Sequence, residues 1–139
     1  MGRNDFYKEH VRKALENDGW KITHDPFGIP FDGTEIEIDF GAERVLMATK
    51  ERETIAVEVK NFLHHSEKMN ELNRLIGQYT NYLESFAVHE PNRRTYVAVT
   101  EEAYQRVFCM PMMAANVKRL NMRFIIFNPY TCKIISWKN

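Results

Sequence analysis

The sequence has no net charge, little cysteine and no long apolar run, and each absence narrows what the protein can be. Its 19 Lys and Arg balance 19 Asp and Glu, so no overall charge demands a nucleic-acid or anionic-membrane partner. The two cysteines, Cys109 and Cys132, form no Cys-x-x-Cys motif, which argues against a zinc ribbon or a redox centre. No apolar stretch approaches about 18 residues, and the charged N-terminus lacks the apolar segment of a signal peptide. These absences predict a cytoplasmic protein with no membrane segment.

The length and composition are those of a folded domain. With 139 residues, of which 44% are apolar, the chain can bury a core as one domain spanning residues 1–139. No repeat, low-complexity stretch or linker interrupts it. Acidic residues are in excess over residues 1–100 and basic residues over 101–139, an asymmetry that would place a basic surface beside an acidic site.

Apolar periodicity predicts an alternation of helices and strands. Helices are expected over residues 5–17, 66–87, 101–108 and from Pro111 towards Leu120, and strands over 20–23, 35–40, 44–49, 54–60, 95–100, 123–128 and 133–138. The Pro- and Gly-rich segment 24–34 is expected to be a loop, Gly41 to interrupt a strand, 50–53 to be a polar turn and Ser66 to cap a helix. This order predicts an α/β (α+β) fold with a central mixed sheet flanked by helices.

The stretch TIAVEVKNF, residues 54–62, carries unusual charges for a buried strand. Its apolar positions alternate with Glu58 and Lys60, so one face is apolar and the other holds a carboxylate and an ammonium. Asp39 ends an earlier strand 19 residues upstream. Pairing of strands in this region would bring the Asp39 and Glu58 carboxylates close together.

Two close carboxylates repel each other, which raises the pKa of one of them unless a cation lies between them. Mg²⁺ prefers oxygen ligands and keeps several waters, so two carboxylates and one carbonyl are sufficient. The pattern predicts Asp39, Glu58 and the Val59 carbonyl as ligands of Mg²⁺ or Mn²⁺. The Lys60 ammonium beside them would neutralise charge that builds up on a phosphate.

The same pattern has simpler interpretations. A Glu-x-Lys on a strand is commonly a surface ion pair worth under about 1 kcal/mol. Alternatively, the three charged residues form a buried structural cluster, and removal of one partner would destabilise the fold by about 3–5 kcal/mol. Downstream, Gln78 and Tyr82 are four residues apart and share a helical face, where they either line the same site or border the core.

A set of stretches in fixed order resembles a known family. They are DGWKITHDP (18–26), IDFGAE (38–43), IAVEVKNF (55–62), GQYTNY (77–82) and NPYTCKIISWKN (128–139). An Asp, then Glu-x-Lys, then a helix with Gln-x-x-x-Tyr looks like the PD-(D/E)XK nuclease superfamily. The full set, which spans essentially the whole chain, resembles the XisH family of element excision controlling factors.

The resemblance implies a restriction-endonuclease-like core and a role in programmed excision of a DNA element, together with a small partner protein, XisI. It also implies metal ligation by Asp39 and Glu58, a catalytic role for Lys60, and a site-lining role for Glu9, Gln78 and Tyr82.

Two functions follow as hypotheses. The first is a Mg²⁺- or Mn²⁺-dependent DNA endonuclease that hydrolyses phosphodiesters, plausibly as a homodimer because cutting both strands commonly pairs two sites. The second is a non-catalytic module of the same fold that docks a partner protein or a recombinase, which the zero net charge favours.

Several further polar residues are candidates for supporting roles. Phosphate contacts are expected from Arg93, Arg94, Lys118, Arg119 and Arg123, each of which is otherwise a surface charge. Glu43 is either an additional acid near the site or a strand-surface charge, and His64 and His65 either reach the phosphate or the metal or belong to a loop.

Overall fold

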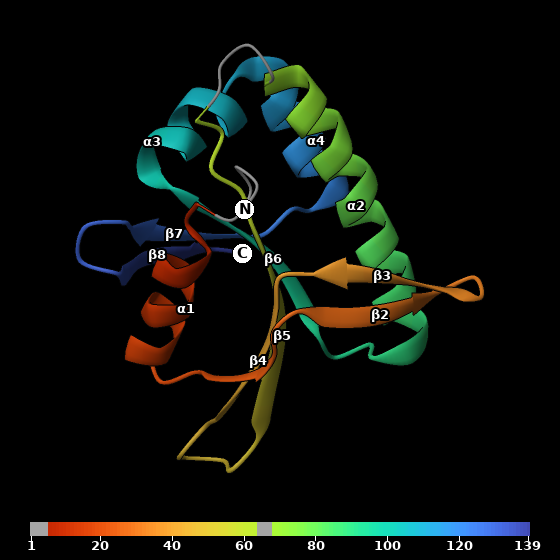
Figure 1. Cartoon of the computed structure of the whole chain (residues 1–139), viewed down its shortest axis with the longest axis vertical. Helices are drawn as coiled ribbons and strands as arrows, with labels where there is room; N and C mark the ends of the chain where they lie inside the picture. The colour runs from red at the N-terminus through yellow and green to blue at the C-terminus, as the bar shows by residue number, and fades with distance from the viewer. Residues whose placement is uncertain (1–5, 64–67) are drawn as a thin grey trace.

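A six-stranded mixed sheet forms the centre of the computed structural model, which describes residues 6–63 and 68–139 (Figure 1). The strand order is β1-β4-β5-β6-β7-β8. The bounds are β1 (Lys21–His24), β4 (Phe40–Val45), β5 (Arg52–Val59), β6 (Arg94–Thr100), β7 (Phe124–Asn128) and β8 (Lys133–Lys138). Strands β5, β6 and β7 are parallel, whereas β1–β4, β4–β5 and β7–β8 pair antiparallel.

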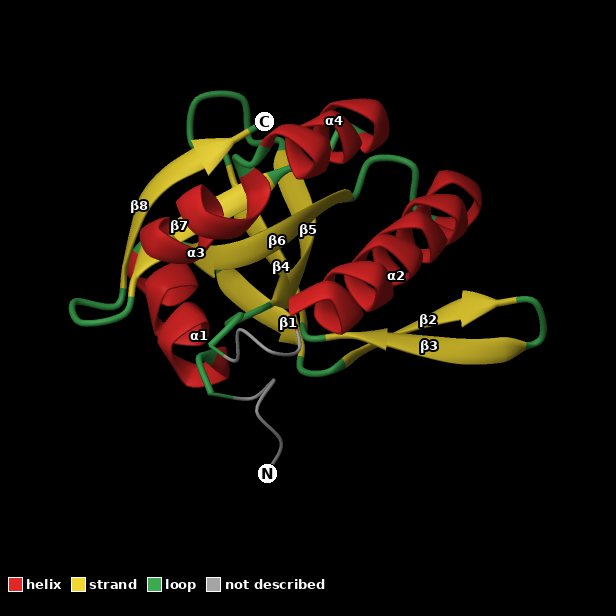
Figure 2. Cartoon of the chain, turned by 90° about the horizontal axis from the view of Figure 1, so that it is seen from above, coloured by secondary structure: helices red, strands yellow, loops and turns green. Residues whose placement is uncertain are grey.

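Helices cover both faces of the sheet (Figure 2). They are α1 (Lys8–Asn17), α2 (Lys68–His89), α3 (Glu101–Ala103), the π-helix η3 (Tyr104–Phe108) and α4 (Pro111–Leu120). Helix α1 packs on one face, while α2, α3, η3 and α4 pack on the other. The two crossover connections, β5-α2-β6 and β6-α3-η3-α4-β7, lie on the same face of the sheet. Crossovers between parallel strands are right-handed, and the strand order advances in the same direction in both connections. The expected mixed sheet flanked by helices is confirmed.

Strand alternation divides the buried side chains between two cores. In β5, the core between the sheet and α1 contains Ile55, Val57 and Val59. Ala56 lies in the core on the other face, which includes residues of α2. Strand β6 is buried on both faces, as its uninterrupted apolar character predicts. Because of this alternation, Glu58 leaves β5 on the same side of the strand as Ala56.

The expected loop over residues 24–34 is wrong. Strand β2 (Phe27–Phe31) pairs antiparallel with β3 (Thr34–Ile38) as a separate hairpin, which the figure shows beside α2 (Figure 1). Its turn is Asp32-Gly33, with φ of 46° and 77°. Positive φ at both turn residues matches the twist of a tight hairpin, and Pro30 is tolerated because a two-stranded ribbon has only edge strands.

Two further boundaries differ from expectation. Gly41 does not interrupt a strand, because β4 runs through it. The position favours glycine, since a Cβ there would lie 2.8 Å from both His24 Nδ1 and Phe27 Cδ2. The turn before β5 also falls earlier than residues 50–53, because β5 begins at Arg52 and continues the hairpin with β4.

The helical predictions are largely confirmed. The predicted helix over 101–108 is a short α3 that continues as η3, and α4 begins at Pro111 as expected. Thr100 caps α3 by accepting a hydrogen bond from the Ala103 N–H at 3.2 Å. The predicted cap Ser66 lies outside the described residues. Across the described ranges, no helix is long and apolar enough to cross a membrane.

Candidate functional site

The predicted charged residues meet where β5 ends. Phe40 of β4 lies opposite Val57 of β5, so Asp39, at the bend between β3 and β4, comes beside Glu58. The Asp39 carboxylate accepts a hydrogen bond from the Val59 N–H at 2.8 Å. Lys60 follows the last residue of β5, and its Nζ lies 3.6 Å from Glu58 Oε2.

Glu58 and Lys60 are buried, and burial decides their electrostatics. Glu58 is 6% exposed and Lys60 is 3% exposed. Burial, followed by repulsion from Asp39, raises the pKa of Glu58 to about 8, against the opposing effect of the Lys60 ammonium. A solvated surface ion pair is therefore not what the structure contains. At neutral pH, Glu58 holds a proton that an ordinary glutamate would have released.

Asp39 is less buried, and its environment is mixed. Burial raises its pKa, while the Val59 N–H bond, Lys8 and Lys60 lower it. The effect of Lys8 comes from α1, the helix on which Glu9 is predicted to line the site. The structure places Glu9 at the exposed surface and brings the Lys8 charge towards Asp39 instead.

Lys8 is a residue that the sequence analysis missed. Its ammonium lies 2.9 Å from Asp25 Oδ1 and 5.3 Å from the centre of the Phe40 ring, immediately after Asp39 in the chain. The only signal available in the sequence was its place on the first helix, one residue before Glu9. Which of the two faces the sheet depends on how α1 packs.

Helix α2 contributes the two predicted polar side chains. The Tyr82 hydroxyl donates a hydrogen bond to the Glu37 carbonyl at 2.9 Å. Burial, followed by the Glu58 and Asp39 charges, raises the pKa of Tyr82, which places its ring beside the carboxylates. Gln78 lies one turn earlier on the same face, and its Oε1 atom is buried without a hydrogen-bond partner within the described part of the chain.

Glu71 adds an acid that the sequence analysis did not single out. It is 7% exposed, and its Oε2 has no hydrogen-bond partner among the described residues. It lies seven residues before Gln78, which is two helical turns, so the two side chains share a face of α2. That spacing was visible in the sequence and would have identified it.

The donor set suits a hard divalent cation. Asp39 and Glu58 would supply carboxylate oxygens and Val59 a carbonyl, and a cation would relieve the repulsion from Asp39 that, after burial, raises the pKa of Glu58. Within residues 6–63 and 68–139, no group of three or more His, Cys, Asp or Glu could hold a metal. With two carboxylates and one carbonyl, the donor set fits an ion such as Mg²⁺, which keeps several waters and binds few protein ligands.

The remaining predicted residues lie elsewhere. Glu43 forms a surface ion pair with Arg52 at 3.5 Å. His64 and His65 lie outside the described residues. Lys118 and Arg119 are exposed on α4, and Arg119 donates to Asn116 Oδ1 at 2.8 Å.

The other three arginines lie near the amino end of β6, far along the sheet from Glu58. Arg94 and Arg123 line a cavity between α2 and this end of β6. The Arg93 side chain is 7% exposed, and its guanidinium donates to Glu90 Oε1 at 2.9 Å and to the Ile55 carbonyl at 2.8 Å. Its guanidinium is thus engaged within the protein.

Comparison with known proteins identifies the family. A model of the family described as XisH protein matches residues 1–135. A solved XisH family protein from Nostoc punctiforme PCC 73102 is 32% identical, with a TM-score of 0.84 over 96% of this chain and 98% of that one. An fdxN element excision controlling factor protein from Anabaena variabilis is 31% identical, with a TM-score of 0.86 over 97% and 99% of the two chains. No curated protein matches. The match over nearly the full length, with the same fold in both relatives, shows that the chain belongs to the XisH family.

Proposed function

We propose that the protein is an excision controlling factor that acts on DNA as a divalent-metal-dependent nuclease with a restriction-endonuclease-like core. The observation that carries the proposal is the Asp39–Glu58 pair, with Glu58 buried and the Lys60 ammonium beside it at the end of β5. Burial and the Asp39 charge raise the pKa of Glu58, and carboxyl groups perturbed in this way cluster at functional sites.

Asp39, Glu58 and the Val59 carbonyl would hold Mg²⁺ or Mn²⁺. When bound, the ion would activate water for attack and stabilise negative charge on the scissile phosphate. The Lys60 ammonium, fixed by burial, adds positive charge where the phosphate charge develops. The Gln78 Oε1 acceptor is available to orient a water, since it has no hydrogen-bond partner among the described residues.

The relatives supply the biological setting. One of them is described as an fdxN element excision controlling factor protein, so we extend programmed excision of a DNA element to this chain. The resemblance to the XisH family adds a small XisI-like partner protein. A homodimer would give one active site for each DNA strand.

A calorimetric titration of Mn²⁺ tests the metal site directly. We expect binding to the wild type and loss of binding in Glu58→Gln, which keeps the shape of the side chain and removes the charge. Glu53→Gln on the same strand is the matched control, since Glu53 pairs with Arg44 away from the site, and it should bind like the wild type. A wild type that binds no Mn²⁺, alone or with DNA and the partner, would contradict the proposal.

The zero net charge favours a second candidate, a nuclease-fold module that docks a partner protein or a recombinase without cutting DNA. The two candidates differ in what the carboxylates do. If Asp39→Asn and Glu58→Gln both fold, bind the partner and still support excision in cells, the docking module is correct. If both bind the partner but abolish excision and cleavage of plasmid DNA, the nuclease is correct.

A further inference from the structure

A second polar cavity lies at the opposite end of β5 from Glu58. Its volume is about 390 Å³, within the range of small-molecule sites, which is about 300–1,000 Å³. We call it the Trp137 pocket; its lining residues are Trp20, Arg44, Arg52, Glu53, Thr54, Ile55, Asn92, Arg94, Tyr96, Trp137 and Asn139. It uses residues three to six positions before Glu58, which corresponds to about 10–20 Å along the strand.

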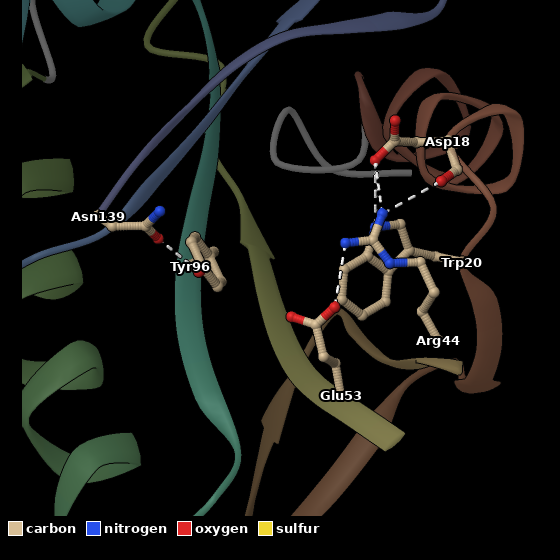
Figure 3. Close-up of polar contacts among 6 residues, drawn as sticks. All are labelled: Asp18, Trp20, Arg44, Glu53, Tyr96 and Asn139. Atoms are coloured by element: carbon tan, nitrogen blue, oxygen red, sulfur yellow. Dashed lines mark hydrogen bonds and ion pairs between the residues drawn. The ribbon is translucent and has the colours of Figure 1, made fainter. Parts of the chain in front are cut away.

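Aromatic rings form the base of the Trp137 pocket. The Trp137 ring centre lies 5.7 Å from that of Trp20 and 5.0 Å from that of Tyr96. Trp20 and Tyr96 are each 4% exposed, whereas Trp137 is only partly buried. The Tyr96 hydroxyl is fixed by Asn139 Oδ1 at 2.6 Å (Figure 3). The two buried rings thus hold Trp137 in place with part of its surface available.

Arginine side chains give the pocket a positive charge. The Arg44 guanidinium lies 4.5 Å from the Trp20 ring centre and is held by Asp18 at 3.5 Å and by Glu53 at 3.1 Å (Figure 3). This ion pair neutralises Glu53, the one acid of the lining. Asp18 and Glu43 also pair with Arg44 and Arg52, so Arg94 is the arginine of the lining whose charge no described acid offsets.

One arginine of the pocket, Arg94, is able to bind a ligand. Arg94 is exposed and makes no ion pair or side-chain hydrogen bond with any other described residue. The Arg52 side chain is 64% exposed and pairs with Glu43 at 3.5 Å, on the opposite face of β5 from Ile55. Arg94 begins β6 opposite Ile55 in the register, so its side chain leaves the sheet on the same face as Ile55 and Tyr96.

We infer that the Trp137 pocket binds a nucleotide, with an unpaired base stacked on Trp137 and its phosphate held by Arg94. An aromatic surface next to an exposed guanidinium group is the combination that binds single-stranded nucleic acid, and the same chemistry would take a free nucleotide. The amides of Asn92 and Asn139 offer donors and acceptors to a base edge. The inference does not rest on metal binding or cleavage at Glu58.

The test is fluorescence anisotropy of a labelled oligothymidylate of about twelve nucleotides, in a chelating buffer so that no divalent ion contributes. We expect binding that weakens with salt, and in Arg94→Ala at least about a fivefold loss with a logarithmic salt slope shallower by about 0.7. Arg74→Ala, which removes an exposed arginine of α2 outside the pocket, is the matched control and should bind like the wild type. Glu58→Gln should also retain binding, which separates this site from the proposed nuclease site.

Trp137→Phe provides the second variant, because it keeps a ring but reduces the stacking surface. We expect at least a several-fold loss of oligonucleotide affinity, with a thermal melt close to that of the wild type. Wild-type tryptophan fluorescence should be quenched by the ligand, and this quenching should be lost in Trp137→Phe because Trp20 is buried beneath.

Titration of thymidine monophosphate distinguishes the two sources of nucleotide. An affinity equal to that of the oligonucleotide identifies a free nucleotide as the ligand, and an affinity that rises with length identifies a single strand. The inference is overturned if no oligonucleotide or mononucleotide binds, if Arg94→Ala and Trp137→Phe bind like the wild type, if duplex DNA binds better than the single strand, or if a polyglutamate peptide competes as well as the oligonucleotide.

Discussion

The protonation state of Glu58 links the chemistry of the site to the stability of the fold. Its pKa is about 8 in the folded protein and 4.5 in an unperturbed glutamate. Between these values the folded state holds a proton that the unfolded state has released, so stability is complete below the lower value and is lost as pH rises through the upper one. We expect the Tm in chelating buffer to fall by a few degrees between about pH 6 and pH 9 because of this residue.

Glu58→Gln isolates that effect. The variant has no carboxylate to ionise, so its Tm should decline less over the same pH range, while Glu53→Gln should follow the wild type. Mn²⁺ should restore the stability of the wild type at the alkaline end, because a cation offsets the repulsion between Glu58 and Asp39. Equal declines in the wild type and Glu58→Gln would show that Glu58 is not the group that titrates.

Substitution of Gln78 should affect stability and cleavage in different ways. Its Oε1 is a buried acceptor without a partner in the described part of the chain, which costs free energy in the folded state. Gln78→Met should therefore leave the Tm unchanged or raise it, while cleavage of plasmid DNA falls by at least about tenfold. Gln105→Met, which removes an amide that donates to Glu101 at the surface, should leave cleavage unchanged. A lower Tm in Gln78→Met would point to a structural role instead.

Strand β4 depends on a missing side chain at Gly41, two residues after Asp39. A methyl group there would meet His24 Nδ1 and Phe27 Cδ2, each at 2.8 Å, so Gly41→Ala should destabilise the protein by about 1–3 kcal/mol in urea unfolding. Gly77 on α2 has no neighbouring atom within 4 Å of such a group. Gly77→Ala should therefore stabilise the fold by about 0.5–1 kcal/mol, as expected in a helix. Shifts of the same sign in both variants would contradict this account.

Local pattern was enough to predict the elements that the sheet buries. The alternation in β5 predicted that Glu58 lies on the opposite face of the strand from its apolar residues. The uninterrupted apolar run of β6 predicted that this strand is buried on both faces. The hairpin β2–β3 could not be predicted in the same way, because Gly28 and Pro30 are typical of loops and the strands are defined by packing on α2. Ser85 of that helix donates to the Pro30 carbonyl at 2.6 Å, a contact between residues far apart in sequence.

The candidate site was also predictable only in part, because some of its residues are recognisable from local sequence and others depend on tertiary packing. Asp39, Glu58 and Lys60 were recognised from their residue types and order. The charge of Lys8 near Asp39 and the internal bonds of Arg93 were not, because both depend on how a helix or a loop docks against the sheet. A residue's type can be read from sequence, whereas the direction of its side chain at the end of an element is set by packing.

At the scale of the whole molecule, the two ends of the central strands carry different charged groups. The Asp39–Glu58 carboxyl groups lie where β5 ends, and Arg52, Arg94 and Arg123 lie about its beginning and that of β6. A polyanion approaching the carboxyl end of β5 meets a site whose charge depends on pH and on bound cations.

Binding of duplex DNA should report the charge of Glu58 without any cleavage. In chelating buffer, ionisation of Glu58 adds a negative charge near the DNA phosphates, so the affinity of the wild type should fall as pH rises from about 6 to about 9. A unit charge at about 4 Å in water is worth about 1 kcal/mol, or about fivefold in affinity. Glu58→Gln should show a smaller change, and Ca²⁺ should restore affinity at pH 9 in the wild type alone. If the two proteins lose affinity in parallel and Ca²⁺ has no effect, duplex DNA does not approach the carboxylates, and the DNA-binding face must be sought at another part of the sheet.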